Sequence, residues 1–264
     1  MSLKLTILGC GSSSGVPRPA FGWGACDPNN PKNRRRRCSI ILERTNGGDK
    51  TVVLVDTSPD LREQLLSVNV QRIDAVLFTH EHADHTHGLD DVRPVVLFMR
   101  KQVPTYMDEE TSHSLHRRFA YCYETPPGSD YQPIVKDRRL IPGHEIEIGG
   151  PGGSISALPF RVHHGTIDAL GFRFGTTAYT PDLNDIPKES LDALTGLDLW
   201  IVDALRPTAH PSHFSLPETL TWIERLKPKQ AILTNLHSDL DYAALCEQLP
   251  ANVIPAFDGL EIVI

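Results

Sequence analysis

The segment from Thr79 to His85 contains an unusually dense set of side chains that can bind metal ions. His80, His82, Asp84 and His85 fall within six residues. On an extended segment His80 and His82 point to the same side, because side chains alternate along a strand. Asp84 and His85 follow after the chain begins to turn, so they can face a second point. The spacing therefore favours two adjacent ions, roughly 3.5–4 Å apart, over a single ion.

A purely structural explanation of this segment is weak. A single histidine, or a loose pair, would be an ordinary surface feature. Here the cluster directly follows the apolar run Ala75–Phe78, which predicts a buried strand. Buried ionisable groups cost several kcal/mol unless they are paired or bound to metal. The position of the cluster after a buried strand thus favours a metal site.

Other predicted strands also end in residues of ligand type. Strands are expected over 155–162, 177–180 and 229–234. The residues that follow them are His163 and His164, then Asp182, then Asn235 and His237. Ligands from separate strand ends that meet at one sheet edge are how α/β proteins build sites. We therefore expect these residues to converge on one sheet edge of an α/β protein.

Asp56 ends another predicted strand, 52–55. It could be a surface carboxylate at a strand end. It could also hold a metal-bound histidine in position, as carboxylates commonly do next to metal centres. Its place beside the histidine cluster favours the second interpretation.

Composition excludes several classes of protein. The chain has 264 residues, 40% hydrophobic and 22% charged, as in ordinary soluble domains, and we predict one domain over residues 1–264. Its apolar runs are too short to span a membrane. Five widely spaced cysteines without a CxxC pair favour reduced thiols and a cytoplasmic protein. The net charge of −7 gives no basic field for nucleic acid or membrane surfaces.

Two further segments leave their role open. The loop from Gly9 to Gly15 is rich in Gly and Ser and suits an anion, but it matches neither phosphate-binding motif and could equally be a flexible turn. The run Arg34–Arg37 favours a solvated loop. Its alternative role is a guanidinium rim that collects an anionic substrate.

The order of motifs resembles the metallo-β-lactamase superfamily. It consists of THxHxDH at 79–85, His164-Gly165, Asp182 and a late histidine. The opening LGCGSSSGVP, Asp56 and the Asp258-Gly259 ending are similar to the phosphodiesterase branch. That branch includes tRNase Z and the cyclic-phosphate phosphodiesterase of the carbon–phosphorus lyase pathway. The resemblance implies a four-layer αβ/βα sandwich, with two mixed sheets flanked by helices.

The resemblance also implies roles for individual residues. One metal ion would be bound by His80, His82 and His164, with His163 the alternative to His164. The second ion would be bound by Asp84, His85 and a late ligand, with Asp182 bridging the two ions. Where relatives have the late histidine this chain has Asn235, and His237 is the expected substitute. The catalytic residues would be Asp84, Asp182 and His213, with His213 assisting the leaving group.

The expected function is a metal-dependent hydrolase with two divalent ions, Zn or Mn. The favoured reaction is phosphodiester hydrolysis of a small nucleotide-like or cyclic phosphate substrate by a metal-bound hydroxide. One alternative is hydrolysis of a thioester, lactone or other carbonyl substrate at the same site. Another is a non-catalytic protein that binds a phosphate ligand through its metals. Relatives are commonly homodimers, and neither membrane nor nucleic acid is an expected partner.

Overall fold

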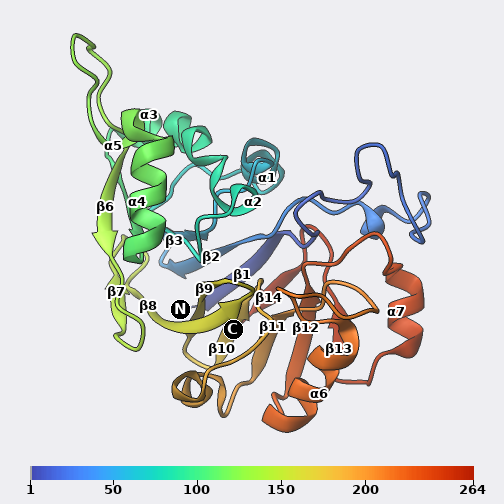
Figure 1. The fold of residues 1–264 in the computed structure, drawn as a ribbon. Coiled ribbons are helices and arrows are strands. Elements are labelled where there is room, and N and C mark those ends of the chain that lie inside the picture. The colour runs from blue at the N-terminus through green and yellow to red at the C-terminus, as the bar shows by residue number, and fades with distance from the viewer. Residues whose placement is uncertain (1) are drawn as a thin grey trace.

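The computed structural model describes residues 2–264. Two sheets of seven strands each lie face to face, with helices on both outer sides (Figure 1). The first sheet has the order β14 (Glu261–Val263), β1 (Ser2–Gly9), β2 (Ser39–Asn46), β3 (Asp49–Val55), β4 (Ala75–Leu77), β5 (Val103–Met107), β6 (Val135–Arg139). The second has the order β13 (Val253–Pro255), β12 (Gln230–Thr234), β11 (Leu199–Asp203), β10 (Thr177–Thr180), β9 (Ile167–Phe174), β8 (Ile155–His164), β7 (Ile146–Ile148).

The helices divide between the two outer faces. The first sheet is covered by α1 (Leu61–Ser67), α2 (Ala83–Thr86), α3 (Arg93–Met99), α4 (Glu109–Arg118) and α5 (Ala120–Tyr123) (Figure 1). The second sheet is covered by α6 (Leu216–Leu226) and α7 (Tyr242–Gln248). Three short 3-10 helices complete the described elements: η1 (Pro31–Asn33), η2 (Leu89–Val92) and η3 (Lys188–Leu194). The α/β sandwich expected from the sequence is confirmed.

Burial on both faces explains why the central strands are apolar throughout. In β3, Val53 and Val55 face the second sheet, whereas Val52 and Leu54 pack under the outer helices. In the second sheet Trp200 packs under α6 and α7, on the face opposite to the inter-sheet core. A strand buried on both faces loses the polar alternation of a surface strand.

The local sequence explains where α6 begins. The Ser215 hydroxyl accepts a hydrogen bond from the backbone nitrogen of Glu218, and the Glu218 carboxylate accepts one from the Ser215 backbone nitrogen at 2.8 Å. These two bonds form a capping box. The described residues include all five cysteines, and each is a free thiol. Within the same residues, no helix combines the length and apolarity that crossing a membrane requires.

The parallel parts of the two sheets determine where the site lies. Strands β3 to β6 run parallel in the first sheet, and β10 to β13 run parallel in the second. The carboxyl ends of β3, β4, β10, β11 and β12 are followed by polar residues from both halves of the chain. Those residues are Asp56, Thr79 with His80, Asp182, Asp203 and Asn235.

Candidate metal centre

The loop after β4 places its histidines through a bonded frame. Asp56, directly after β3, accepts hydrogen bonds from the backbone nitrogen and hydroxyl of Thr79, both at 2.8 Å. The Thr79 hydroxyl also lies 3.0 Å from Nδ1 of His80. The short helix α2 begins after His82 and carries His85 into the interior. The motif is thus fixed by the neighbouring strand end as well as by its own turn.

Asp56 also orients His85, as the sequence had indicated. Its Oδ2 lies 2.7 Å from Nδ1 of His85, and since a carboxylate accepts, this nitrogen carries the proton. The other ring nitrogen, Nε2, then faces Asp182 at 3.3 Å and Asp84 at 3.5 Å. The Asp56 backbone has φ of +64°, a left-handed conformation that is uncommon for a residue other than glycine. This strained conformation supports a functional constraint at Asp56.

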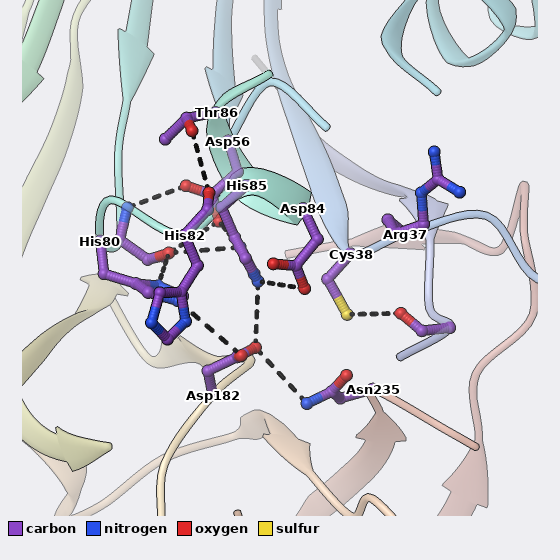
Figure 2. A network of polar contacts seen from close by, with 12 residues as sticks. Arg37, Cys38, Asp56, His80, His82, Asp84, His85, Thr86, Asp182 and Asn235 are labelled. Atoms are coloured by element: carbon purple, nitrogen blue, oxygen red, sulfur yellow. Dashed lines mark hydrogen bonds and ion pairs between the residues drawn. The ribbon is translucent and has the colours of Figure 1, made fainter. Parts of the chain in front are cut away.

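The structure brings five of the predicted metal donors, together with His213, into three overlapping groups, each with its ligand atoms within 4.8 Å of one another. Asp84 belongs to none of these groups and lies 3.5 Å from Nε2 of His85. Figure 2 shows the histidines of the motif facing Asp182, and Asn235 lying next to Asp182. The groups are His80 with His82 and His164, His80 with His85 and Asp182, and His164 with Asp182 and His213. His80, His164 and Asp182 each belong to two groups.

His164, and not His163, faces this cluster. Its Nδ1 lies 2.6 Å from the backbone carbonyl of Ser212, so Nδ1 carries the proton and Nε2 is free to bind a metal. That Nε2 lies 3.2 Å from Nδ1 of His82. The exposed ring of His163 instead pairs with Asp168 at 2.8 Å.

Electrostatics keep the cluster ready to bind cations. Burial, together with the neighbouring His85, holds the pKa of His80 well below its usual value, so this ring is neutral. Burial raises the pKa of Asp182, but His85 and the other nearby imidazoles outweigh it and hold this pKa well below the usual range. Neutral imidazole and ionised carboxylate are the forms that bind metal, so His80 and Asp182 are in the binding form. Burial lowers the pKa of His85, but Asp182, Asp56 and Asp84 outweigh it and hold this pKa well above its usual value, so a metal ion bound there would displace the proton of His85.

The cluster fits divalent ions. The buried Nε2 of His80 has no hydrogen-bond partner among the described residues. An unpartnered buried donor or acceptor is costly, and a metal ion would satisfy it. The donor set of imidazoles and carboxylates suits Zn or Mn.

A histidine–aspartate pair lies beside the cluster. Nδ1 of His213 is 2.7 Å from Oδ2 of Asp203, the fully buried residue that ends β11. Burial alone would lower the pKa of His213. The Asp203 carboxylate outweighs this effect and raises the pKa to about 9. Burial raises the pKa of Asp203 to about 7. Asp203 had no role in the sequence interpretation, although it ends a strand in the same way as Asp56.

His237 does not join these groups, and the expectation that it supplies the late ligand is not met. Its Nδ1 pairs with Asp239 at 2.9 Å. Asn235 lies there instead, with its amide nitrogen 3.0 Å from Nδ1 of His213 and 3.5 Å from Asp182. The expectation assumed an extended chain after β12, but Asn235 is left-handed at φ of +59°, which removes the alternation.

The run Arg34–Arg37 is mostly structural. Arg35 belongs neither to a solvated loop nor to a rim that could collect an anionic substrate. Arg35 is 2% exposed and donates to backbone carbonyls of the segment after β12. The next two arginines form ion pairs, Arg36 with Asp258 at 3.0 Å and Arg37 with Asp60 at 2.9 Å.

The chain also matches a known protein family. Residues 51–235 match the family model described as the beta-lactamase superfamily domain. The chain belongs to this superfamily. The matched residues include the THxHxDH motif, His164, Asp182 and Asn235.

Solved structures agree with this membership. A crystal structure of a new diphosphatase from the PhnP family is 36% identical, with a TM-score of 0.89 over 100% of this chain and 98% of that chain. Zinc-bound PqqB from Methylobacterium extorquens is 17% identical, with a TM-score of 0.75 over 98% of this chain and 99% of that one, and shows the same fold. Superfamily membership and the diphosphatase likeness identify this chain as a metal-dependent hydrolase.

A curated relative is similar along nearly the whole chain. It is an octanoyltransferase from Porphyromonas gingivalis (strain ATCC BAA-308 / W83), 29% identical over 265 residues. The match covers 99% of this chain but only 52% of the relative, so the chain spans about half of that protein's length.

Proposed function

We propose that the chain hydrolyses a phosphodiester or diphosphate bond in a small, nucleotide-like or cyclic phosphate substrate. The observation that carries the proposal is the His213–Asp203 pair beside the donor cluster. It supplies a positioned acid where a leaving oxygen needs a proton. The 36% identity to a PhnP-family diphosphatase supports the same substrate class.

In this proposal two divalent ions, Zn or Mn, are held by the cluster. His80, His82 and His164 would hold one ion, Asp84 and His85 would hold the other, and Asp182 would serve both. When bound, the ions supply a water with a lowered pKa, and positive charge opposite the phosphoryl oxygens.

The chain's own groups then direct the reaction. The carboxylates of Asp84 and Asp182 accept hydrogen bonds from the attacking water and orient it toward phosphorus. Asp203 engages Nδ1 of His213, which leaves Nε2 to protonate the leaving oxygen. Asp203 holds the imidazole in that tautomer and stabilises its charged form.

The test is release of p-nitrophenol from bis-p-nitrophenyl phosphate by protein loaded with Mn²⁺ or Zn²⁺, beside the same protein treated with chelator. We expect release only with metal, and loss of most of it in His213→Ala at unchanged metal content. Protein that holds two ions and releases nothing would contradict the proposal.

Hydrolysis of an acyl thioester is the second candidate function. The observation in its favour is the similarity to the octanoyltransferase, although the match covers half of that protein. Cleavage of octanoyl-pantetheine, measured by release of the free thiol, distinguishes this candidate from the first. Metal-dependent thioester cleavage without phosphodiester cleavage would select this candidate.

A further inference from the structure

The two halves of the metal centre offer different kinds of donor atom. His80, His82 and His164 form a group of three imidazoles whose ligand atoms lie within 4.8 Å of one another. Nδ1 of His80 lies 3.0 Å from the Thr79 hydroxyl, so its buried and unpartnered Nε2 is the nitrogen left for one ion. Among residues 2–264, no cysteine belongs to any of the donor groups. The first position, defined by these three histidines, is therefore rich in nitrogen.

The second position, defined by Asp84 and His85, offers mainly oxygen. Its imidazole nitrogen is Nε2 of His85, because Asp56 holds Nδ1 of the same ring at 2.7 Å. That Nε2 lies 3.5 Å from an Asp84 oxygen and 3.3 Å from an Asp182 oxygen. Figure 2 shows Asp84, His85 and Asp182 joined by dashed lines, with Asn235 next to Asp182. One imidazole and two carboxylates thus serve this position.

Asn235 lies where a further imidazole would make the two positions alike. It is 3% exposed, and its amide nitrogen lies 3.5 Å from Asp182 and 3.0 Å from Nδ1 of His213. The nitrogen of an amide is a hydrogen-bond donor, and only its carbonyl oxygen is an acceptor. In either orientation of the amide, Asn235 therefore adds oxygen or nothing to the second position. His213, the remaining imidazole of the donor groups, is engaged by Asp203.

Donor type determines which divalent ion a position favours. Imidazole suits Zn²⁺, whereas carboxylate, carbonyl and water oxygens suit Mn²⁺. A site of either kind binds Zn²⁺ more tightly than Mn²⁺, so selectivity is expressed as the ratio of the two affinities. We expect this ratio to be larger at the nitrogen-rich first position than at the oxygen-rich second position. A limited supply of Zn²⁺ then fills the first position and leaves the second to Mn²⁺.

From this difference we infer that the centre selects two different ions, Zn²⁺ at the first position and Mn²⁺ at the second, and that Asn235 sets this selectivity. The inference rests on the proposed function for the presence of two ions. It deepens that proposal because it assigns an ion to each position. It also gives Asn235 a role in metal selection that is separate from the hydrolysis itself.

The first test uses wild-type protein and needs no substrate. Metal-free protein receives one equivalent of Zn²⁺ in the presence of excess Mn²⁺, and unbound ions are then removed. Two neighbouring Mn²⁺ ions couple magnetically, whereas Mn²⁺ beside Zn²⁺, a d¹⁰ ion, gives the electron paramagnetic resonance spectrum of an isolated ion. We expect the isolated-ion spectrum and equal amounts of Zn and Mn by mass spectrometry. Persistent coupled Mn²⁺ pairs would show that the positions are alike and would overturn the inference.

The second test changes the donor set at Asn235. Asn235→His adds an imidazole, and histidine tolerates a left-handed backbone better than most residues. We expect Zn²⁺ affinity at the second position to rise about tenfold or more, because even a partner of a ligand contributes about 10–100-fold. Competition between Zn²⁺ and a chromogenic chelator measures this affinity, and Mn²⁺ uptake beside one equivalent of Zn²⁺ should fall by the same factor.

A matched control separates this effect from the substitution itself. Asn69, in the turn after α1, is also left-handed, at φ of +52°, and its side chain is exposed. Asn69→His should leave the Zn²⁺ and Mn²⁺ affinities unchanged. If Asn235→His and Asn69→His behave alike, Asn235 does not set the selectivity.

These measurements keep the inference distinct from the proposed reaction. A mixed Zn–Mn centre in protein that releases no p-nitrophenol would support the inference and contradict the phosphodiesterase proposal. Equal selectivity at the two positions in protein that does release p-nitrophenol would overturn the inference alone. Protein that binds fewer than two ions would contradict both.

Discussion

The two sheets contribute to the metal centre in different ways. The first sheet supplies His80, His82, Asp84 and His85 from one loop after β4. The second sheet supplies its residues from several places, at or after the ends of β8, β10, β11 and β12. The arrangement of residues within this one loop is fixed by hydrogen bonds to the loop, such as those that Asp56 accepts. The scattered residues depend on the strand register of the whole second sheet.

Asp182 gives the largest expected effect, because it joins the two contributions. It lies within reach of His80 and His85 from the first sheet and His164 and His213 from the second. Asp182→Ala should lower kcat/KM on bis-p-nitrophenyl phosphate by about 1,000-fold or more, since metal charge stabilisation is worth several kcal/mol. Metal content, measured by mass spectrometry, should fall below two ions per chain. Full metal content with near-normal rate would remove Asp182 from the centre.

His213 tests whether the second sheet contributes chemistry in addition to ligands. His213→Ala should retain two ions but lose about 100-fold or more in kcat, the usual contribution of a positioned acid. Asp203→Asn should lose less, because the imidazole remains. If His213→Ala loses metal in proportion to activity, its role is ligation and the proposed acid is wrong.

Asp56 tests how far the first loop depends on its neighbouring strand end. Asp56→Asn keeps the shape of the side chain but removes its negative charge and one of its two acceptor oxygens. It therefore cannot accept all three hydrogen bonds, from the Thr79 nitrogen, the Thr79 hydroxyl and His85. We expect metal affinity to fall about 10–100-fold, the usual cost of losing a partner of a metal-bound histidine. Competition with a chromogenic chelator measures this, with Asp60→Asn as a control for a paired carboxylate elsewhere. Unchanged affinity would show that the loop is held by its own turn.

His237 gives the smallest expected effect on the metal centre. His237→Ala should retain two ions and change kcat/KM on bis-p-nitrophenyl phosphate less than about twofold, since Asn235 lies at the centre instead. Loss of one ion in this variant would return His237 to the ligand set.

Prediction from sequence worked best where the signal was local. The central strands were readable because burial on both faces makes them apolar runs. The α6 capping box was readable because its partners are three residues apart. The role of Asp203 was missed because a carboxylate at a strand end gives no sign of its partner, ten residues later in His213.

Arginines show the same limit. The run Arg34–Arg37 drew attention because its charges are consecutive, yet Arg35 is buried and two of its neighbours are paired with carboxylates. Whether a guanidinium is available to a ligand depends on which acids fold against it, and sequence proximity does not report that.

The sequence by itself determined the donors of the THxHxDH loop, because their spacing is close. Its order of motifs resembles the superfamily, and that resemblance implied the α/β sandwich. Only the tertiary structure decided which later residues reach the centre. It placed His164 and Asn235 there, and His163 and His237 elsewhere, because one left-handed residue or one step along a strand turns a side chain to another direction.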